Sequence, residues 1–298
     1  MKTLVTGLSG FVGSHCAEQF ACVDLELDGQ PVDLRRAGDV CAALDQIRPQ
    51  RVIHLAAQSS VPAAFDDPAG TLDVNLGGTL NLLSALRKTG FDGRMLFVGS
   101  GDVYGTVPES ELPVIEDRPL RPRNPYAVSK VAAEALCYQW SQTGPFDIVI
   151  ARPFNHVGPR QDPRFAVASF AQQLVRVRRG KAAPQLTVGD VDATRDFTDV
   201  RDVVRAYSHL LESGRSGSTY NVCSGVERSL RSIIETLSAL TDTAVALTVA
   251  SDRLRPSEQR RVRGSHERLS QDTGWQPSIA FEQTLADIIE YWEQKEAA

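Results

Sequence analysis

The stretch VTGLSGFVG, residues 5–13, is the feature that most restricts how this chain can fold. It places Gly7, Gly10 and Gly13 directly after a short apolar run and at the start of a helix-like segment. This spacing lets the chain turn tightly, brings backbone N–H groups close to a pyrophosphate and lets the helix pack on the strand. A purely structural turn is the alternative. The strand before and the helix after favour a dinucleotide-binding loop.

Short apolar runs alternate with helix-length amphipathic segments in the first half of the chain. The strand-like runs are KTLVTG, CVDLEL, RVIHLAA, MLFVGS and FDIVIARP. Strands separated by helices indicate right-handed βαβ units and a parallel sheet. We therefore predict an α/β protein with a Rossmann-type doubly wound parallel sheet in residues 1–155. A smaller mixed α/β substrate-binding lobe is expected mainly in residues 156–298, with segments that return to the first domain.

Charge and composition restrict the class of partner. The formal net charge of −5 argues against nucleic acid or an anionic membrane as the main partner. The chain has no run of about 18 apolar residues and its N-terminus lacks a signal-peptide pattern, so we expect a cytoplasmic protein. The cysteines show no CxxC spacing and the histidines no HxxxH pattern, so we expect reduced thiols and no metal site.

The adenosine end of the predicted pocket is less clearly marked. An acid about 20 residues after the glycine loop usually binds a ribose hydroxyl and favours NAD. Here the run CVDLELDG carries three acids, at positions 24, 26 and 28, and Asp33 follows beside Arg35 and Arg36. The acids fit either a ribose contact or a solvated edge strand, and the arginines fit either a 2′-phosphate or surface charge. The residues alone leave the phosphate state of the cofactor open.

The segment NPYAVSKVAAEAL starts a helix and places Tyr126 and Lys130 on one face, four residues apart. A free phenol, with a pKa of about 10, is a poor acid or base at neutral pH. A lysine ammonium one turn away, together with an oxidised nicotinamide, favours the phenolate and tunes it for proton exchange. Ser100, after the run MLFV, can donate a hydrogen bond to the same oxygen. These three residues are candidates for a catalytic trio, although an ordinary exposed helix pair is the alternative.

Five motifs occur in the order VTGLSGFVG, HLAA at residues 54–57, DVNLGGTLNLL, SGDVYG and YAVSK. Over nearly the whole chain they resemble the extended short-chain dehydrogenase/reductase family that acts on nucleotide sugars. The resemblance implies that Ser100, Tyr126 and Lys130 are catalytic and that Asn75 supports the active site. It also implies a set of cofactor-binding residues, in which Ala56 and Ala57 line the groove: Gly7, Gly10, Phe11, Val12, Gly13, Asp33, Leu34, Leu55, Ala56, Ala57, Asn75, Tyr126 and Lys130.

The second half of the chain carries candidate substrate-binding residues. Asn155 in ARPFNHVGPR and Arg195 in TRDFTDV match the family's residues for the sugar-nucleotide diphosphate, and Arg255 in RPSEQ fits a second phosphate or ribose contact. Arginine suits this role because its planar fork can grip two phosphate oxygens. The stretches GDVDATRDFTDV, YNVCSG and RRVRGSH resemble the reductases of this family that act on GDP-4-keto-6-deoxy sugars. The resemblance implies a GDP-sugar substrate and NADPH as the cofactor, with NADH as the alternative.

The turn GSGDVYG, residues 99–105, bears on the choice between reduction and dehydration. Dehydratases of this family place a glutamate base two residues after the serine or threonine, and many place an aspartate directly after it. Here those positions are Asp102 and Gly101. The shorter carboxylate would fall about 1 Å short of the carbon-bound proton, a displacement that can cost roughly a hundredfold in rate. We therefore expect reduction, in which Ser100 polarises the carbonyl.

Three further expectations follow from the resemblance. Asp102 is expected to bind a sugar hydroxyl or the backbone of its own turn, and Tyr104 to pack or to contact substrate. The helices after Asn75 and Tyr126 are apolar enough to pair in a homodimer, in the manner of the family.

A nucleotide-sugar 4-epimerase or 4,6-dehydratase that keeps NAD tightly bound is the alternative function. The region before Asp33 is shorter than in the family, which bears on the adenosine end of the pocket.

Overall fold

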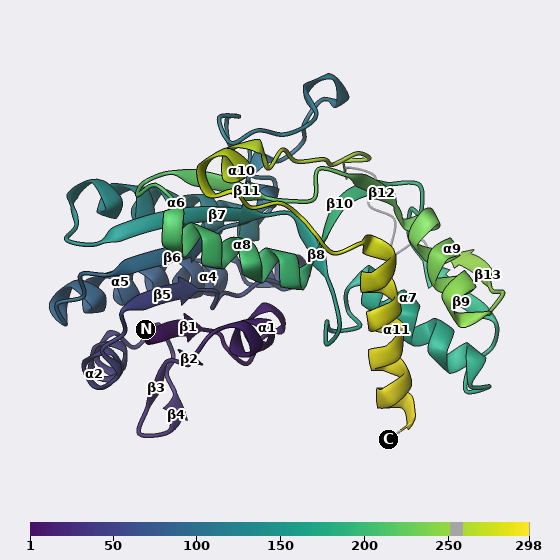
Figure 1. Ribbon diagram of the computed structural model, residues 1–298, viewed down its shortest axis with the longest axis horizontal. Coiled ribbons are helices and arrows are strands. Elements are labelled where there is room, and N and C mark those ends of the chain that lie inside the picture. The colour runs from purple at the N-terminus through teal and green to yellow at the C-terminus, as the bar shows by residue number, and fades with distance from the viewer. Residues whose placement is uncertain (251–258, 298) are drawn as a thin grey trace.

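A six-stranded parallel sheet lies at the centre of the computed structural model, which describes residues 1–250 and 259–297 (Figure 1). The strands run in the order β11-β7-β6-β5-β1-β2, and every neighbouring pair is parallel. Their bounds are β1 (Thr3–Thr6), β2 (Cys22–Val23), β5 (Arg51–His54), β6 (Arg94–Val98), β7 (Asp147–Pro153) and β11 (Thr219–Val222). All four residues of β1 are buried, as expected for a parallel sheet that is covered on both faces.

Helices cover both faces of this sheet. One face packs against α2 (Ala37–Ile47), α5 (Gly78–Lys88) and α6 (Pro125–Thr143). The other face packs against α1 (Phe11–Gln19), α8 (Val200–Ser213) and α10 (Glu267–Thr273), and α8 crosses the near side of the sheet in Figure 1. The sequence of α8 explains this packing, because its apolar residues lie on one face at three- and four-residue spacings. All of them are buried: Val200, Val203, Val204, Ala206, Tyr207, Leu210 and Leu211. The predicted doubly wound α/β fold is confirmed.

A second lobe lies beside the sheet and has its own core. It contains α7 (Ala166–Arg178), α9 (Leu230–Thr241) and α11 (Phe281–Ala297), together with the parallel pair β9 (Gln185–Val188) and β13 (Ala246–Val249). A mixed three-stranded sheet lies between the two parts and consists of β8 (Asn155–Val157), β10 (Thr194–Asp199) and β12 (Glu227–Ser229). Strand β10 pairs in parallel with β8 and antiparallel with β12.

The chain crosses between the two parts more than once. Helix α8, strand β11 and helix α10 all come after residue 156, yet they pack on or within the central sheet. Residues after 155 thus supply one strand and two helices of the part built on the six-stranded sheet. The division of the chain into domains at residue 155 remains a prediction.

Short elements connect these layers, and local sequence explains where they begin. The hairpin β3 (Glu26–Leu27) and β4 (Gln30–Pro31) follows β2, while α3 (Val61–Asp66), α4 (Pro68–Leu72) and a π-helical turn at 73–77 lead into α5. Two 3₁₀ turns occupy residues 101–104 and 109–111. Helix α6 begins where the sequence predicts, because the Asn124 side chain accepts a hydrogen bond of 2.7 Å from the Ala127 N–H and proline fills the next position.

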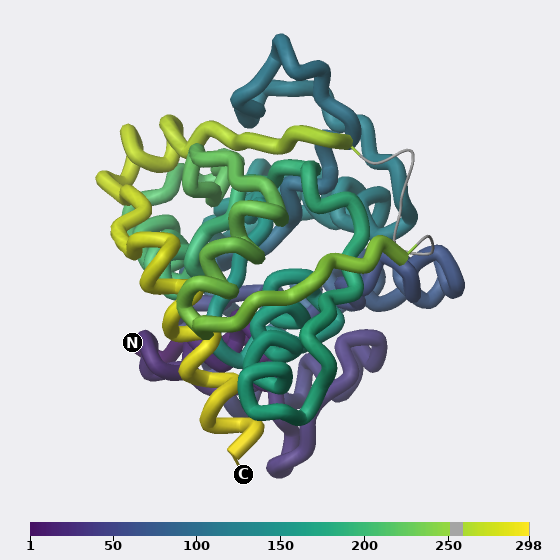
Figure 2. The backbone as a smooth tube through the Cα atoms, turned by 90° about the vertical axis from the view of Figure 1, so that its right-hand side faces the viewer, coloured from purple at the N-terminus to yellow at the C-terminus, as the bar shows by residue number. Residues whose placement is uncertain are grey.

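A strap at residues 259–265 ties the loop after the turn at residues 99–105 to the C-terminal half, and Figure 2 shows it running across the molecule beside that loop. The Gln259 amide accepts from the Val107 N–H and donates to the Val107 carbonyl, both at 3.0 Å. Val114 donates to the Arg263 carbonyl at 2.8 Å and accepts from the Ser265 N–H at 2.9 Å. The loop is thereby held by side-chain and backbone hydrogen bonds from a distant part of the sequence.

In residues 1–250 and 259–297, no helix is long and apolar enough to cross a membrane. The same residues hold no group of three or more His, Cys, Asp or Glu side chains placed to bind a metal ion. The five cysteines are unpaired in the structure.

Candidate active site

The predicted site residues meet at the carboxyl edge of the parallel sheet. The glycine loop follows β1, residues 55–58 follow β5, the Ser100 turn follows β6, and Asn155 follows β7. Ligands of open α/β sheets bind at this edge, because loops from neighbouring strands converge there.

The glycine loop has the geometry that a pyrophosphate requires. Gly7 adopts φ +79°, and a Cβ at this position would lie 3.1 Å from the Ala56 backbone. A Cβ at Gly13 would overlap the Gly7 carbonyl oxygen. Gly10 is the N-cap of α1 and provides no side-chain cap, so the helix N-terminus is open to an anion. The loop therefore fits a dinucleotide pyrophosphate.

Asn75 joins the segment after β5 to helix α6. It is buried in the π-helical turn, and its side chain accepts from the Gln58 N–H at 2.8 Å. Its amide donates to the Gln58 carbonyl at 3.0 Å and to the Ser129 hydroxyl of α6 at 2.8 Å. π-Helical turns often occur at functional sites. With three hydrogen bonds to the protein, the side chain is built to support neighbouring residues.

The structure brings Ser100, Tyr126 and Lys130 together. The Ser100 side chain forms a hydrogen bond with the Tyr126 phenol and accepts from the Asp102 N–H at 3.2 Å. Lys130, one helical turn further along α6, donates to the Val98 carbonyl at 2.8 Å, at the end of β6. The three candidate catalytic side chains therefore occupy one small region between α6 and β6.

Burial is the main influence on the pKa of the Tyr126 phenol. Burial raises the pKa of Tyr126 above its ordinary value, the nearby Asp102 carboxylate raises it further, and the hydrogen bond with Ser100 only partly opposes them. Burial also lowers the pKa of Lys130 to about 8. Burial therefore favours the neutral phenol, the form that can donate a proton. The expectation that Lys130 together with an oxidised nicotinamide favours the phenolate stays a prediction.

The rest of the Ser100 turn separates into exposed and buried groups. Asp102 is exposed at the edge of the turn. A Cβ at Gly101 would lie 3.1 Å from the Phe154 ring, so this ring fills the space that a side chain would need. Tyr104 is buried, donates to the Asn221 amide oxygen at 2.6 Å and accepts from Arg152 at 2.7 Å. Of the two roles expected for Tyr104, packing is the one that fits, and contact with substrate is wrong because the side chain is enclosed.

The candidate substrate-binding residues lie on the mixed sheet. Asn155 is exposed on β8 and its Cα is paired with Phe197 of β10. Arg195 stands two residues before Phe197 and is half-buried, so strand alternation places it on the same face as Asn155. Its guanidinium donates to the Thr194 carbonyl at 2.8 Å. Arg255, the third predicted contact, lies outside the described residues.

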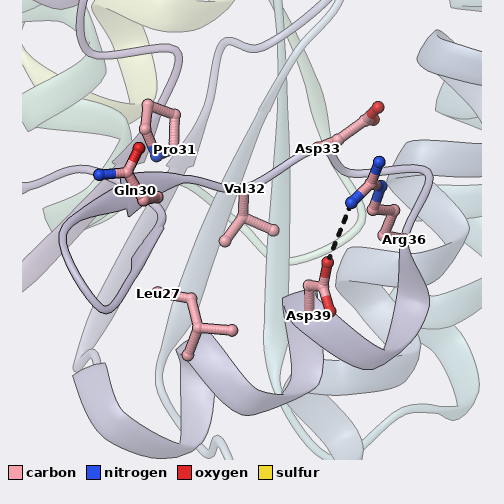
Figure 3. A pocket seen from close by; sticks show the side chains of 7 residues that line it. All are labelled: Leu27, Gln30, Pro31, Val32, Asp33, Arg36 and Asp39. Atoms are coloured by element: carbon pink, nitrogen blue, oxygen red, sulfur yellow. Dashed lines mark ion pairs between the residues drawn. The ribbon is translucent and has the colours of Figure 1, made fainter.

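A cavity of about 360 Å³ lies at the predicted adenosine end, and the short β3–β4 hairpin forms one side of it (Figure 3). It is lined by Leu27, Gln30, Pro31, Val32, Asp33, Arg36 and Asp39. The Arg35 guanidinium pairs with the Asp33 carboxylate at 2.6 Å and lowers the pKa of this acid to about 2. Arg36 lies at the cavity and is 3.9 Å from Asp39. Because the Asp33 carboxylate is already paired with Arg35, the Arg36 guanidinium is at least as available to a ligand in this cavity as the Asp33 carboxylate is.

Sequence reasoning missed several residues that build the site. Asp196 is fully buried next to Arg195, and its carboxylate accepts from the backbone of Ser224, Gly225 and Gly264 at 2.8–3.1 Å. These contacts join β10 to the strap and no local motif signals them. Glu134 was detectable in principle, because it follows Tyr126 and Lys130 at the same helical spacing.

A family model described as GDP-mannose 4,6 dehydratase matches residues 22–288. GDP-6-deoxy-D-mannose reductase of Pseudomonas aeruginosa is 48% identical over 301 residues, which span 99% of this chain and 98% of that protein. The chain belongs to the extended short-chain dehydrogenase/reductase family. The resemblance inferred from the motifs is thereby confirmed. Another relative, UDP-glucose 4-epimerase of Mycolicibacterium smegmatis, is 31% identical over 320 residues. The match spans 99% of this chain and 99% of that protein.

Solved structures agree with this assignment. The structure of RMD from Pseudomonas aeruginosa complexed with NADPH matches with a TM-score of 0.92 at 47% identity, over 99% of both chains. The UDP-glucose 4-epimerase of Thermus thermophilus in complex with NAD matches with a TM-score of 0.85 at 32% identity, over 98% of this chain and 99% of that one. Reductases and epimerases therefore share this fold, so the reaction has to be argued from the site.

Proposed function

We propose that this protein reduces the 4-keto group of GDP-4-keto-6-deoxy-D-mannose with NADPH and forms GDP-D-rhamnose, also called GDP-6-deoxy-D-mannose. The observation that carries the proposal is the Ser100 turn. It presents a serine hydrogen-bonded to the Tyr126 phenol, whose pKa burial raises, while Gly101 and the short Asp102 stand where related dehydratases carry acids. Full-length similarity to a GDP-6-deoxy-D-mannose reductase, at 48% identity, supports the substrate class.

The side chains have separate roles in this reaction. A reduced nicotinamide supplies the hydride when it is bound. Ser100 donates a hydrogen bond to the carbonyl oxygen, and Tyr126 gives that oxygen its proton, which burial keeps on the phenol. Lys130, whose ammonium donates to the Val98 carbonyl, would hold the nicotinamide ribose and return a proton to the phenol through the ribose hydroxyls and water. Asn155 and Arg195 hold the diphosphate, so that remote binding energy positions the reacting carbon.

An epimerase or dehydratase with tightly bound NAD is the second candidate, because the family model carries a dehydratase description and an epimerase is 31% identical. The Phe154 ring leaves little room for an acid at position 101, which weighs against the dehydratase. An epimerase would keep its cofactor through purification and need none added. Protein that is purified free of nicotinamide and requires added NADPH supports the reductase.

The reaction is tested by following nicotinamide oxidation with 4-keto-6-deoxy sugars linked to GDP, UDP and dTDP. We expect turnover with the GDP-sugar, one NADPH consumed per sugar, and a higher kcat/KM with NADPH than with NADH. The arginine at the adenosine cavity and the NADPH in the RMD structure motivate the cofactor preference. Equal or better kcat/KM with NADH would reverse the preference and leave the reductase assignment standing. If none of the three sugars is turned over, the reductase assignment is refuted.

Replacing Arg195 with alanine is expected to raise KM for the GDP-sugar by about 10- to 150-fold. This range corresponds to the loss of a charge-assisted hydrogen bond worth roughly 1.5–3 kcal/mol. KM for NADPH should stay within about twofold. Arg179→Ala is the matched control, because Arg179 is exposed and donates to the Glu293 carbonyl of α11. Equal weakening of both ligands would place Arg195 outside the sugar-nucleotide pocket.

We also propose that the protein is a homodimer. Exposed apolar side chains gather on α3 to α6: Phe65, Leu72, Leu80, Val128 and Tyr138. These helices lie on one side of the sheet, so a second copy could cover the residues together. Light scattering at micromolar concentration should give about twice the mass of one chain, and Val128→Glu should lower it. A monomeric parent protein would exclude the dimer.

A further inference from the structure

Helix α6 contacts the end of β6 through three successive turns. Tyr126 meets Ser100, Lys130 donates to the Val98 carbonyl, and Glu134 lies one turn further along the same face. Glu134 is 6% exposed and carries a charge that must be compensated. Its partner is Arg152 of β7, which is 5% exposed.

Arg152 joins helix α6 to the Ser100 turn. Its Nε donates to the Glu134 carboxylate at 2.9 Å, and its Nη2 donates to the other oxygen of the same group. Its Nη1 donates to the Tyr104 hydroxyl at 2.7 Å and to the Glu116 carbonyl at 3.1 Å. The guanidinium also lies 4.9 Å from the centre of the Tyr104 ring. A rigid fork with this many partners fixes the groups around it.

The Ser100 turn is anchored on both sides of the serine. Before it, Gly99 packs so closely that a Cβ would lie 3.1 Å from the Ala151 carbonyl oxygen and 3.5 Å from a Glu134 carboxylate oxygen. After it, Tyr104 closes the 3₁₀ turn and is held by Arg152 and by Asn221. The position of the half-buried Ser100 hydroxyl therefore depends on the buried residues that hold both ends of its turn.

We propose that Tyr104 is a positioning residue: through Arg152 and Glu134 its hydroxyl fixes the Ser100 turn against α6, and so sets the Ser100 hydroxyl against the Tyr126 phenol. The inference rests on the proposed function for the role of Ser100. A displacement of about 1 Å at a reacting group can cost on the order of a hundredfold in rate, so loosening the turn reduces turnover while the distant diphosphate contacts persist.

The direct test is Tyr104→Phe, which removes the hydroxyl and keeps the ring. We expect kcat to fall about tenfold, while KM for the GDP-sugar and for NADPH stays within twofold. Tyr220→Phe is the matched control. Tyr220 is also fully buried, it lies on β11, and its hydroxyl donates to the Asp272 carboxylate at 2.8 Å and accepts from the Arg215 N–H at 3.0 Å. Its removal should leave kcat unchanged. An unchanged kcat in Tyr104→Phe, or an equal loss in Tyr220→Phe, would overturn the proposal.

A double-mutant cycle with Ser100→Ala separates positioning from general stability. If Tyr104 acts through Ser100, Tyr104→Phe has an effect of less than about twofold once the serine hydroxyl is gone. A tenfold loss that persists in the Ser100→Ala background means a merely structural role and overturns the proposal. The parent protein runs in the same assay. If the unmutated protein has no reductase activity, the proposed function is refuted. The same double-mutant cycle is then measured on the 4-epimerase or dehydratase turnover that the unmutated protein shows. If the effects of Tyr104→Phe and Ser100→Ala are independent in that assay, the positioning role is overturned as well.

Discussion

Replacing Tyr126 with phenylalanine is expected to lower kcat by about 10²–10⁴-fold, the range for the loss of a general acid. The variant keeps the ring and loses only the hydroxyl that Ser100 contacts. The proton has no equally placed donor, because Lys130 is directed to the Val98 carbonyl. The lost group acts on the reacting oxygen, so binding of NADPH should be nearly unchanged.

Steady-state kinetics and fluorescence titration with NADPH check this prediction together. Tyr291→Phe is a suitable control, since this tyrosine lies on α11 in the second lobe. The control should keep the parent rate. A Tyr126→Phe protein that retains more than about a tenth of the parent kcat would show that another group is the acid.

Replacing Glu134 with alanine is expected to cost about 3–5 kcal/mol of unfolding free energy, the largest stability effect that we predict. The change leaves the Arg152 guanidinium buried without its carboxylate, and removal of one partner from a buried ion pair has roughly this cost. Arg152 would keep Tyr104 and the Glu116 carbonyl, which are neutral acceptors and do not compensate its charge.

Urea denaturation of the two proteins measures this difference. The control is Glu293→Ala, which removes the partner of Arg178 in a pair whose side chains are 35% and 50% exposed. Solvent screens such pairs, so this change should cost at most about 1 kcal/mol. A Glu134→Ala loss no larger than that of the control would mean that the buried pair contributes little to stability.

The parts of the fold that the sequence predicts correctly are governed by short stretches of chain. The glycine loop requires close approach of backbone at Gly7 and Gly13, which few other residues allow. The start of α6 follows from Asn124 and the proline after it. Because the spacing of Tyr126 and Lys130 is helical, their shared face follows from the same local rule.

The missed parts depend on contacts between distant residues. Asp196 and Gly264 are 68 positions apart, and nothing around either one signals that a buried carboxylate accepts from the strap. The raised pKa of Tyr126 depends on how deeply α6 and the Ser100 turn enclose the phenol, so the presence of Lys130 in the sequence does not determine it. The closed environment of Tyr104 depends on Arg152 and Asn221, which follow it by 48 and 117 residues.

Direct delivery of hydride to carbon 4 is tested most directly with NADPH that carries deuterium at both positions of nicotinamide carbon 4. The purified protein is mixed with GDP-4-keto-6-deoxy-mannose, and the product is examined by NMR and mass spectrometry. We expect one deuterium at carbon 4 of the sugar, none at carbon 5, and one oxidised cofactor per 4-hydroxy product. A parallel sample of GDP-mannose and NAD in deuterated water should release no water and gain no deuterium. A product without deuterium at carbon 4, or a 4-keto sugar labelled at carbon 5 from GDP-mannose, would contradict the reductase and make Asp102 the base of a dehydration.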